Sequence, residues 1–217
     1  FEPVSLIAVN QCSGNSRSLF APRVPGGQWR HGAIGNARWT GVRLRDLLHD
    51  ADLQRGAADV SFRGLDAPPL PSVAAFVKSL PVEKALEPDL LVAYEMNGQP
   101  LPLLNGFPLR LVVPGWYATY WVKALSEITV ASAPFRGFWM DKAYRVPRYD
   151  PPAGETPGHL AEDTVPINRM RLRSLIVQPE PGQLLARGQE VEIQGVALDY
   201  GSGITGVEVS VDNGASW

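Results

Sequence analysis

The stretch LLVAYEMNGQPLPLLNGFPLRLVVPG, residues 90–115, decides how this chain of 217 residues folds. Its first part, Leu90 to Met96, is mostly apolar and predicts a buried strand. Asn97-Gly98 follows, a dipeptide that strongly favours the two-residue turn of a β-hairpin. Leu109 to Pro114 has the pattern of another buried strand. The stretch therefore predicts a strand-rich fold with tight turns.

Similar short apolar segments extend on both sides of this stretch. They are separated by turns rich in the chain's 20 Pro and 21 Gly, and long helical periodicity is scarce. The expected elements are a strand over Val4–Val9, an amphipathic helix over Val42–Leu53, a strand over Val60–Arg63, a strand or single turn over Phe76–Leu80, and a helical turn followed by a strand over Val122–Val130. We therefore expect the α+β class, as a mixed, β-rich domain.

The composition changes between Arg148 and Pro166, where Pro, Gly and charged residues predict a linker. Beyond it, alternating or β-branched segments suit the first strands of a small β-sandwich; these are Leu175–Gln178, Glu190–Ala197 and Gly206–Val211. We expect a first domain over 1–150, a linker over 151–173 and a partial immunoglobulin-like β-sandwich over 174–217. Both ends of the sequence look cut, so we expect the first domain to lack its N-terminal segment.

Composition and charge exclude several classes of function. The formal net charge is -2, which gives no general reason to expect nucleic acid or an anionic membrane as partner. No apolar run is long enough to span a bilayer. A single Cys excludes disulfides within the chain and a zinc site with several thiolates, and three His argue against metal sites built on imidazole.

The single cysteine lies where a strand gives way to a loop, in Cys-Ser-Gly-Asn-Ser-Arg, residues 12–17. Gly14 and Asn15 allow unusual backbone angles, and Arg17 brings a permanent cation that favours a thiolate. The motif fits a metal-binding Cys12, but it equally fits a turn with a buried structural Cys and a surface Arg.

A nucleophilic Cys12 would need a base, and the histidines offer little choice. His49 falls on the polar side of the expected helix, and His159 falls in the expected linker. His31, in Trp-Arg-His-Gly, is the one serious candidate. A Cys–His hydrolase therefore stays open, without a second motif to support it.

Two further groups of residues suit an anionic ligand. Arg110 and Lys123 flank an apolar strand and an aromatic turn, and a guanidinium with an ammonium is what a phosphate-bearing ligand requires. Tyr144 lies between two cations, Lys142 and Arg145, so its hydroxyl could bind an anion or relay a proton. The alternatives are a buried strand with charged ends and a surface tyrosine.

Together these motifs resemble the sulfite oxidase family of molybdopterin oxidoreductases. The resemblance is carried by Cys12–Arg17, Gln28–Val42, Gly64-Leu65-Asp66, Tyr94–Pro102, and Gly106–Arg110 with Val113-Pro114-Gly115. The blocks Asn-Gly-Phe-Pro-Leu-Arg and Trp-Tyr-Ala-Thr-Tyr-Trp look most like bacterial sulfite dehydrogenases. Ser174–Trp217 looks like the start of the family's immunoglobulin-like dimerisation domain.

The resemblance implies a cofactor, molybdenum with molybdopterin, and a role for each matching residue. Cys12 would be the protein ligand of the metal, since soft sulfur suits molybdenum. Arg17 and Tyr144 would line the substrate pocket as catalytic residues. The residues that would hold the pterin are Asp66, Asn105, Arg110, Trp121, Val122 and Lys123. The family often has His where this chain has Asn105, and a further substrate-binding Arg of the family lies upstream of the Cys motif.

The resemblance also implies an activity: oxidation of sulfite to sulfate by oxygen-atom transfer. No Cys-x-x-Cys-His haem motif is present, so electrons would pass to a c-type cytochrome or a haem subunit. The expected protein is periplasmic and a homodimer when full length. The alternatives are a sulfane-sulfur dehydrogenase or a methionine-sulfoxide reductase on the same fold, or a non-catalytic β-rich binding module with a structural Cys.

Overall fold

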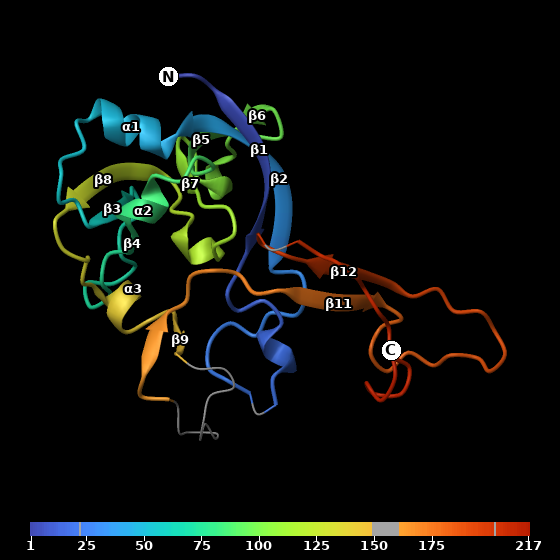
Figure 1. Ribbon diagram of the computed structural model, residues 1–217. Helices are drawn as coiled ribbons and strands as arrows, with labels where there is room; N and C mark the ends of the chain where they lie inside the picture. The colour runs from blue at the N-terminus through green and yellow to red at the C-terminus, as the bar shows by residue number, and fades with distance from the viewer. Residues whose placement is uncertain (22, 149–160, 202) are drawn as a thin grey trace. The chain divides into compact units, whose positions relative to one another are not determined.

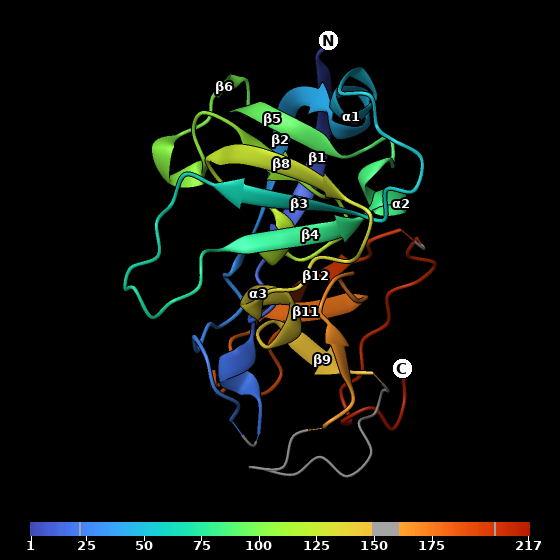
Figure 2. The ribbon, with the colours of Figure 1, turned by 90° about the vertical axis from the view of Figure 1, so that its left-hand side faces the viewer.

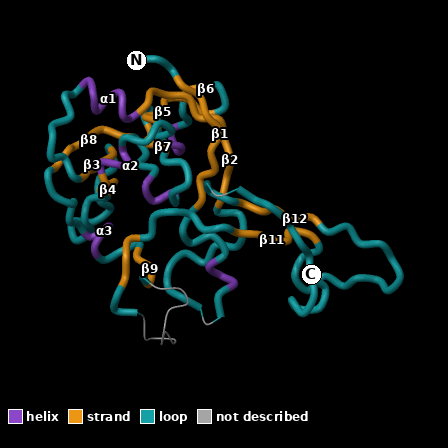
Figure 3. The backbone as a smooth tube through the Cα atoms, in the orientation of Figure 1, coloured by secondary structure: helices purple, strands orange, loops and turns teal. Residues whose placement is uncertain are grey.

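The chain divides into two compact units, Phe1–Asn168 and Arg169–Trp217 (Figure 1). The computed structural model describes residues 1–21, 23–148, 161–201 and 203–217. Residues 151–160 of the expected linker, with His159, lie outside the described residues. The domain limits at 150 and 174 stay predictions. Strands and loops make up most of both units (Figure 3), and the expected strand-rich α+β class is confirmed.

The larger sheet of the first unit contains five antiparallel strands in the order β1-β2-β5-β6, with β7 also paired to β5. The strands are β1 (Val4–Gln11), β2 (Ile34–Arg43), β5 (Leu91–Met96), β6 (Gln99–Pro100) and β7 (Arg110–Val112). The predicted hairpin is confirmed, because Met96 pairs with Gln99 across Asn97-Gly98. Both turn residues have positive φ angles, 54° and 77°, as this kind of turn requires.

A second antiparallel sheet follows the order β4-β3-β8, and Figure 2 shows its strands side by side. These strands are β3 (Asp59–Gly64), β4 (Val77–Pro81) and β8 (Leu125–Ala131). The hydrophobic core draws buried side chains from both sheets, among them Trp39 of β2, Phe62 of β3 and Leu111 of β7. Burial of these side chains is the main force that holds the unit together.

The remaining elements of the first unit are short. The helices are α1 (Leu44–Asp50), α2 (Val82–Ala85) and α3 (Phe138–Asp141). The 3-10 turns are η1 (Arg17–Leu19), η2 (Leu103–Asn105) and η3 (Ala118–Tyr120). The short strands β9 (Arg145–Pro147) and β10 (Thr164–Pro166) pair antiparallel. Within the described residues, no helix has the length and apolar character needed to cross a bilayer.

Two elements differ from the prediction because some of their residues form backbone hydrogen bonds with other segments of the chain. The helix expected over Val42–Leu53 begins only at Leu44, since Val42 and Arg43 pair with β5. The helical turn expected at Val122 lies earlier, in η3, because the carbonyl of Val122 accepts a hydrogen bond from Leu111 N at 2.9 Å. Of the two structures predicted for Phe76–Leu80, a strand or a single turn, the strand forms, as β4 over Val77–Pro81.

The second unit contains one antiparallel pair, β11 (Arg173–Gln178) with β12 (Gln194–Leu198), and a bulge interrupts its register. Residues 206–211, which were expected to form a strand, are described and form none. An alternating pattern gives a strand only where a neighbouring strand can accept its hydrogen bonds. The immunoglobulin-like sandwich stays a prediction.

Candidate functional site

One cavity of the first unit, of about 690 Å³, gathers eight of the nine predicted site residues. They are Cys12, Asp66, Asn105, Arg110, Trp121, Val122, Lys123 and Tyr144. They come from segments far apart in the sequence, and the two sheets bring these segments together. The volume lies within the range of small-molecule and cofactor sites.

Cys12 follows directly after β1, and its loop is held against the segment before β2. The amide of Cys12 donates to Ala33 O at 2.9 Å, and its own carbonyl accepts from Asn15 N at 3.0 Å. The sulfur accepts from the amide of Gly14 at 3.4 Å and is half-buried. The loop therefore holds Cys12 in the wall of the cavity.

Arg17 is not among the residues that line this cavity. Its guanidinium lies across Gly14 and Gly26, so closely that a Cβ on Gly14 would be 2.8 Å from its carbon. Its Nη1 donates to the carbonyl of Gly27 at 3.2 Å. Arg17 therefore lies beside the Cys12 loop, and its predicted contact with substrate stays a prediction.

His31 is bonded to the same loop rather than to the cysteine. Its Nδ1 lies 2.6 Å from the Ser16 hydroxyl, within hydrogen-bonding distance. This places the imidazole in the support of the loop, which disfavours a Cys–His nucleophilic pair. His49 is exposed at the end of α1, as its position in the sequence predicts.

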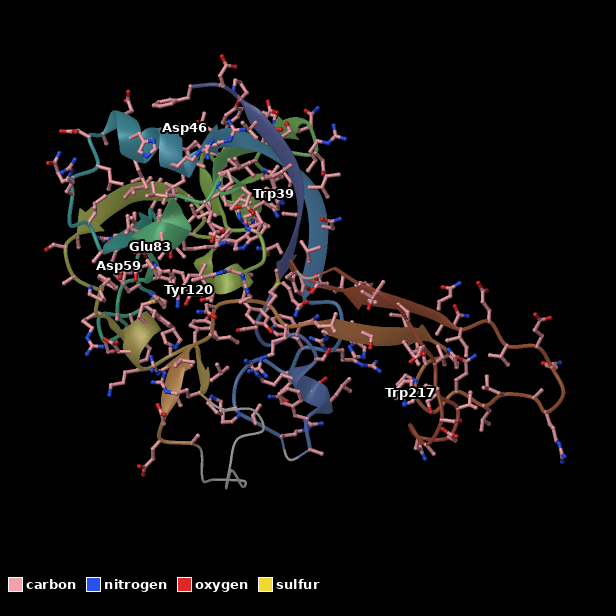
Figure 4. The ribbon with its side chains drawn as sticks, viewed as in Figure 1. Trp39, Asp46, Asp59, Glu83, Tyr120 and Trp217 are labelled. Carbon is pink, nitrogen blue, oxygen red and sulfur yellow. The ribbon has the colours of Figure 1, made fainter. Side chains whose placement is uncertain are left out.

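Arg110 opens β7 with a guanidinium that is almost wholly buried, at 7% exposure. Its Nη1 donates to Asn105 O at 3.1 Å, and the group lies over the rings of Trp39 and Trp121 at 5.0 and 5.7 Å. Trp39, labelled in Figure 4, and Trp121 pack edge to face. Burial lowers the pKa of Arg110 to about 10, so this cation stays charged at neutral pH.

Lys123 and Asp66 reach the cavity because two glycines let their backbones approach closely. A Cβ on Gly64 would lie 2.4 Å from the carbonyl of Lys123 and 2.5 Å from Oδ1 of Asp66. Gly106, with φ 107°, also approaches Lys123 closely, because a Cβ on Gly106 would lie 2.9 Å from Lys123 Cβ. Nζ of Lys123 donates to the Leu104 carbonyl at 3.0 Å, which keeps the exposed ammonium at this edge.

Tyr144 contributes an aromatic ring to the cavity from the segment after α3. Its φ is 54°, a left-handed conformation that is costly for a bulky residue and common at functional sites. Its carbonyl accepts from Ile167 N at 2.8 Å, and its ring packs against Phe76 and Trp139 at centroid distances of 6.5 and 6.0 Å. The surrounding contacts therefore fix this conformation.

Two polar residues of the cavity wall, Asn10 and Thr119, were not predicted from the sequence. Among the described residues, Asn10 Nδ2, Thr119 Oγ1 and Arg110 Nε are buried atoms without a hydrogen-bond partner. The place of Asn10 in the site could have been predicted, because it lies two residues before Cys12 and residues at this spacing share one face of a strand. Nothing in the sequence distinguishes Thr119 from the aromatic turn around it.

Comparison with known proteins gives these residues a family. Residues 1–139 match the oxidoreductase molybdopterin binding domain, and residues 164–217 match the Mo-co oxidoreductase dimerisation domain. Mitochondrial sulfite oxidase of Mus musculus is 39% identical over 220 residues, which cover 95% of this chain and 38% of that protein. The chain belongs to the sulfite oxidase family of molybdopterin oxidoreductases. The family expected from the sequence is confirmed.

Other members of the family extend the comparison. Sulfite oxidase of Arabidopsis thaliana is 34% identical over 225 residues, 98% of this chain and 56% of that protein. The chain thus spans between about two fifths and about half of these relatives. The fold is also similar to the crystal structure of the sulfane dehydrogenase SoxCD from Paracoccus pantotrophus, with a TM-score of 0.67 and 24% sequence identity. This match covers 83% of this chain and 42% of the SoxCD chain. That likeness shows the fold.

The cavity fits the molybdopterin cofactor of the family. Three buried polar atoms in its wall find no hydrogen-bond partner in the described part of the chain, and such atoms are costly unless a ligand or water satisfies them. Arg110 and Lys123 would supply positive charge for the phosphate of the cofactor. Cys12 would supply a soft sulfur ligand, which suits molybdenum. Among the described residues, no group of three or more His, Cys, Asp or Glu side chains forms a separate metal site.

Proposed function

We propose that this chain is the catalytic part of a molybdenum-dependent sulfite dehydrogenase. The observation that carries the proposal is the cavity that brings Cys12, Arg110, Lys123 and Tyr144 together in a chain 39% identical to a sulfite oxidase. The reaction converts sulfite and water to sulfate, two protons and two electrons. A molybdenum cofactor, when bound, would supply the oxygen-atom transfer and the two-electron redox chemistry.

The residues of the chain bind and orient the reactants. Cys12 would hold the metal through its sulfur, and Arg110, Thr119 and Asn10 would donate hydrogen bonds to the cofactor. Lys123 would pair with the phosphate of the cofactor. The Tyr144 hydroxyl binds the oxyanion at the cavity wall, and Arg17 adds positive charge beside the Cys12 loop.

The electron acceptor and the assembly belong to the same proposal. We take the acceptor to be a c-type cytochrome, met in the periplasm, as the resemblance of the chain to bacterial sulfite dehydrogenases implies. A homodimer of the full-length protein is supported by the match of residues 164–217 to a dimerisation domain.

The experiment is a substrate comparison on the full-length, cofactor-loaded protein with cytochrome c as acceptor. Sulfite should reduce the cytochrome far faster than thiosulfate, and methionine sulfoxide should not be reduced with an artificial donor. Faster turnover of a sulfane-sulfur compound than of sulfite would replace the substrate and keep the cofactor. Protein without bound molybdenum and without activity would favour a binding module with a structural Cys12.

A further inference from the structure

Lys78 lies inside the first unit with no exposed surface at all. It belongs to β4, and its register neighbour in β3 is Phe62, a core residue. Lysine is almost never buried this completely unless its charge is paired. The surroundings of its ammonium group therefore decide what this residue does.

The contacts of the ammonium group are one carbonyl and two aromatic rings. Nζ donates to the carbonyl of Trp139 at 2.8 Å. It lies 4.5 Å from the ring centroid of Tyr120, labelled in Figure 4, and 5.2 Å from that of Tyr144. None of the ion pairs among the described residues includes Lys78. Its charge is thus held by dipoles and ring faces, without a carboxylate to neutralise it.

One of these two rings belongs to the wall of the cofactor cavity. Tyr144 lines the cavity, and so does Phe76, which lies two residues before Lys78. Phe76, Trp139 and Tyr144 pack against one another with centroid distances from 5.4 to 6.5 Å. Lys78 contacts this aromatic wall without lining the cavity, so it can act on a bound molecule only through the wall.

We infer that Lys78 is a positioning residue for oxyanion binding, whose ammonium group holds the Tyr144 ring in place at the cavity wall. The inference rests on the proposed function for the place of the anion beside Tyr144. Tyr120 completes the seat of the ammonium from the other side, in the buried turn η3.

Two physical arguments support this role. A buried charge without a carboxylate partner costs stability, and an apolar side chain of the same length would not carry that cost. The cost is explained if the ammonium group holds a tyrosine ring that binds an anionic ligand. Burial lowers the pKa of Lys78 to about 8, which still leaves most of the group charged at neutral pH.

The experiment measures the binding of sulfate, a non-reacting oxyanion, to the full-length, cofactor-loaded protein by titration calorimetry. Lys78→Met removes the charge and keeps the length of the side chain, and we expect it to raise the Kd for sulfate about tenfold. Lys78→Gln, also neutral, keeps a donor for Trp139 O and serves the same test if the Met variant does not fold. Molybdenum content should stay at the level of the parent protein.

Two comparisons separate a positioning role from a merely structural one. Lys84 also lies over a tryptophan ring, at 5.6 Å from that of Trp116, but neither residue lines the cavity, so Lys84→Met should change the Kd less than about twofold. In a Tyr144→Leu background, Lys78→Met should likewise add less than about twofold, because it acts through Tyr144.

The outcomes are distinct. An unchanged Kd in the neutral Lys78 variants, an equal loss with and without Tyr144, or no saturable sulfate binding by the parent protein would overturn the inference. Sulfate binding needs no turnover. If the parent protein fails to oxidise sulfite while sulfate affinity follows the expected pattern, the proposed function fails and the inference stands.

Discussion

Cys12 is the residue on which the proposed chemistry depends most directly. Its sulfur accepts a hydrogen bond from Gly14 N and lines the cavity, while its backbone is bonded to Ala33 and Asn15. We expect Cys12→Ser to abolish sulfite oxidation, because a hard hydroxyl replaces a soft thiolate. The fold should be kept, since the backbone bonds do not need the sulfur. The checks are activity and circular dichroism, and full turnover in this variant would remove the ligand assignment.

Thr119 tests whether the unpartnered polar atoms of the wall bind the cofactor. Thr119→Val keeps the shape of the side chain and removes the hydroxyl, so a donor to the cofactor is lost. We expect pterin and molybdenum to be retained several-fold less well in dialysis, at a cost of about 1 kcal/mol. Thr119→Ser, which keeps the hydroxyl, is the matched control. Equal cofactor retention in the Val and Ser variants would show that the hydroxyl binds nothing.

The burial of Lys78 predicts an effect on the stability of the protein as well as on its affinity for sulfate. Burial lowers its pKa from 10.5 to about 8, so between these pH values the unfolded chain binds a proton that the folded chain has released. The free energy of unfolding therefore rises with pH between pH 8 and 10.5. Below pH 8, burying the charged Lys78 side chain lowers the free energy of unfolding by its full amount, about 3 kcal/mol. Urea unfolding should show this rise in the parent protein relative to Lys78→Met. Parallel pH profiles would contradict it.

At the scale of elements, the site is assembled where loops come into close contact with strand ends. Gly64, at the end of β3, leaves no room for a side chain between the Lys123 carbonyl and Asp66. We expect Gly64→Ala to cost about 1–3 kcal/mol of stability and to reduce cofactor retention. Gly35→Ala is the control, because nothing lies within 4 Å of the added Cβ. Equal thermal midpoints for the two variants would refute the close approach.

How much the sequence could predict depends on whether a residue's partners are local. The hairpin at Asn97-Gly98 is encoded by its own two residues, so it was predictable. Helix α1 begins two residues late because β5 captures Val42 and Arg43, a long-range pairing that no local pattern reveals. The site shows the same division. Cys12 could be predicted from its sequence motif. The roles of Thr119 and Lys78 depend on the residues that pack around them in the fold, so they could not be predicted.

At the scale of the whole molecule, we expect the two compact units to carry different parts of the function. The cavity and every residue proposed to bind cofactor or substrate belong to Phe1–Asn168. The second unit matches a dimerisation domain, and we expect its part to be assembly rather than chemistry. Since the chain spans only part of its relatives, these activities are best measured on the full-length protein.

The most direct test of the central claim combines elemental analysis with a sulfite-driven cytochrome c reduction assay on one preparation of the full-length protein. We predict close to one molybdenum per chain and cytochrome reduction that depends on sulfite. Properly matured protein that contains no molybdenum and leaves cytochrome c oxidised in the presence of sulfite would contradict the account.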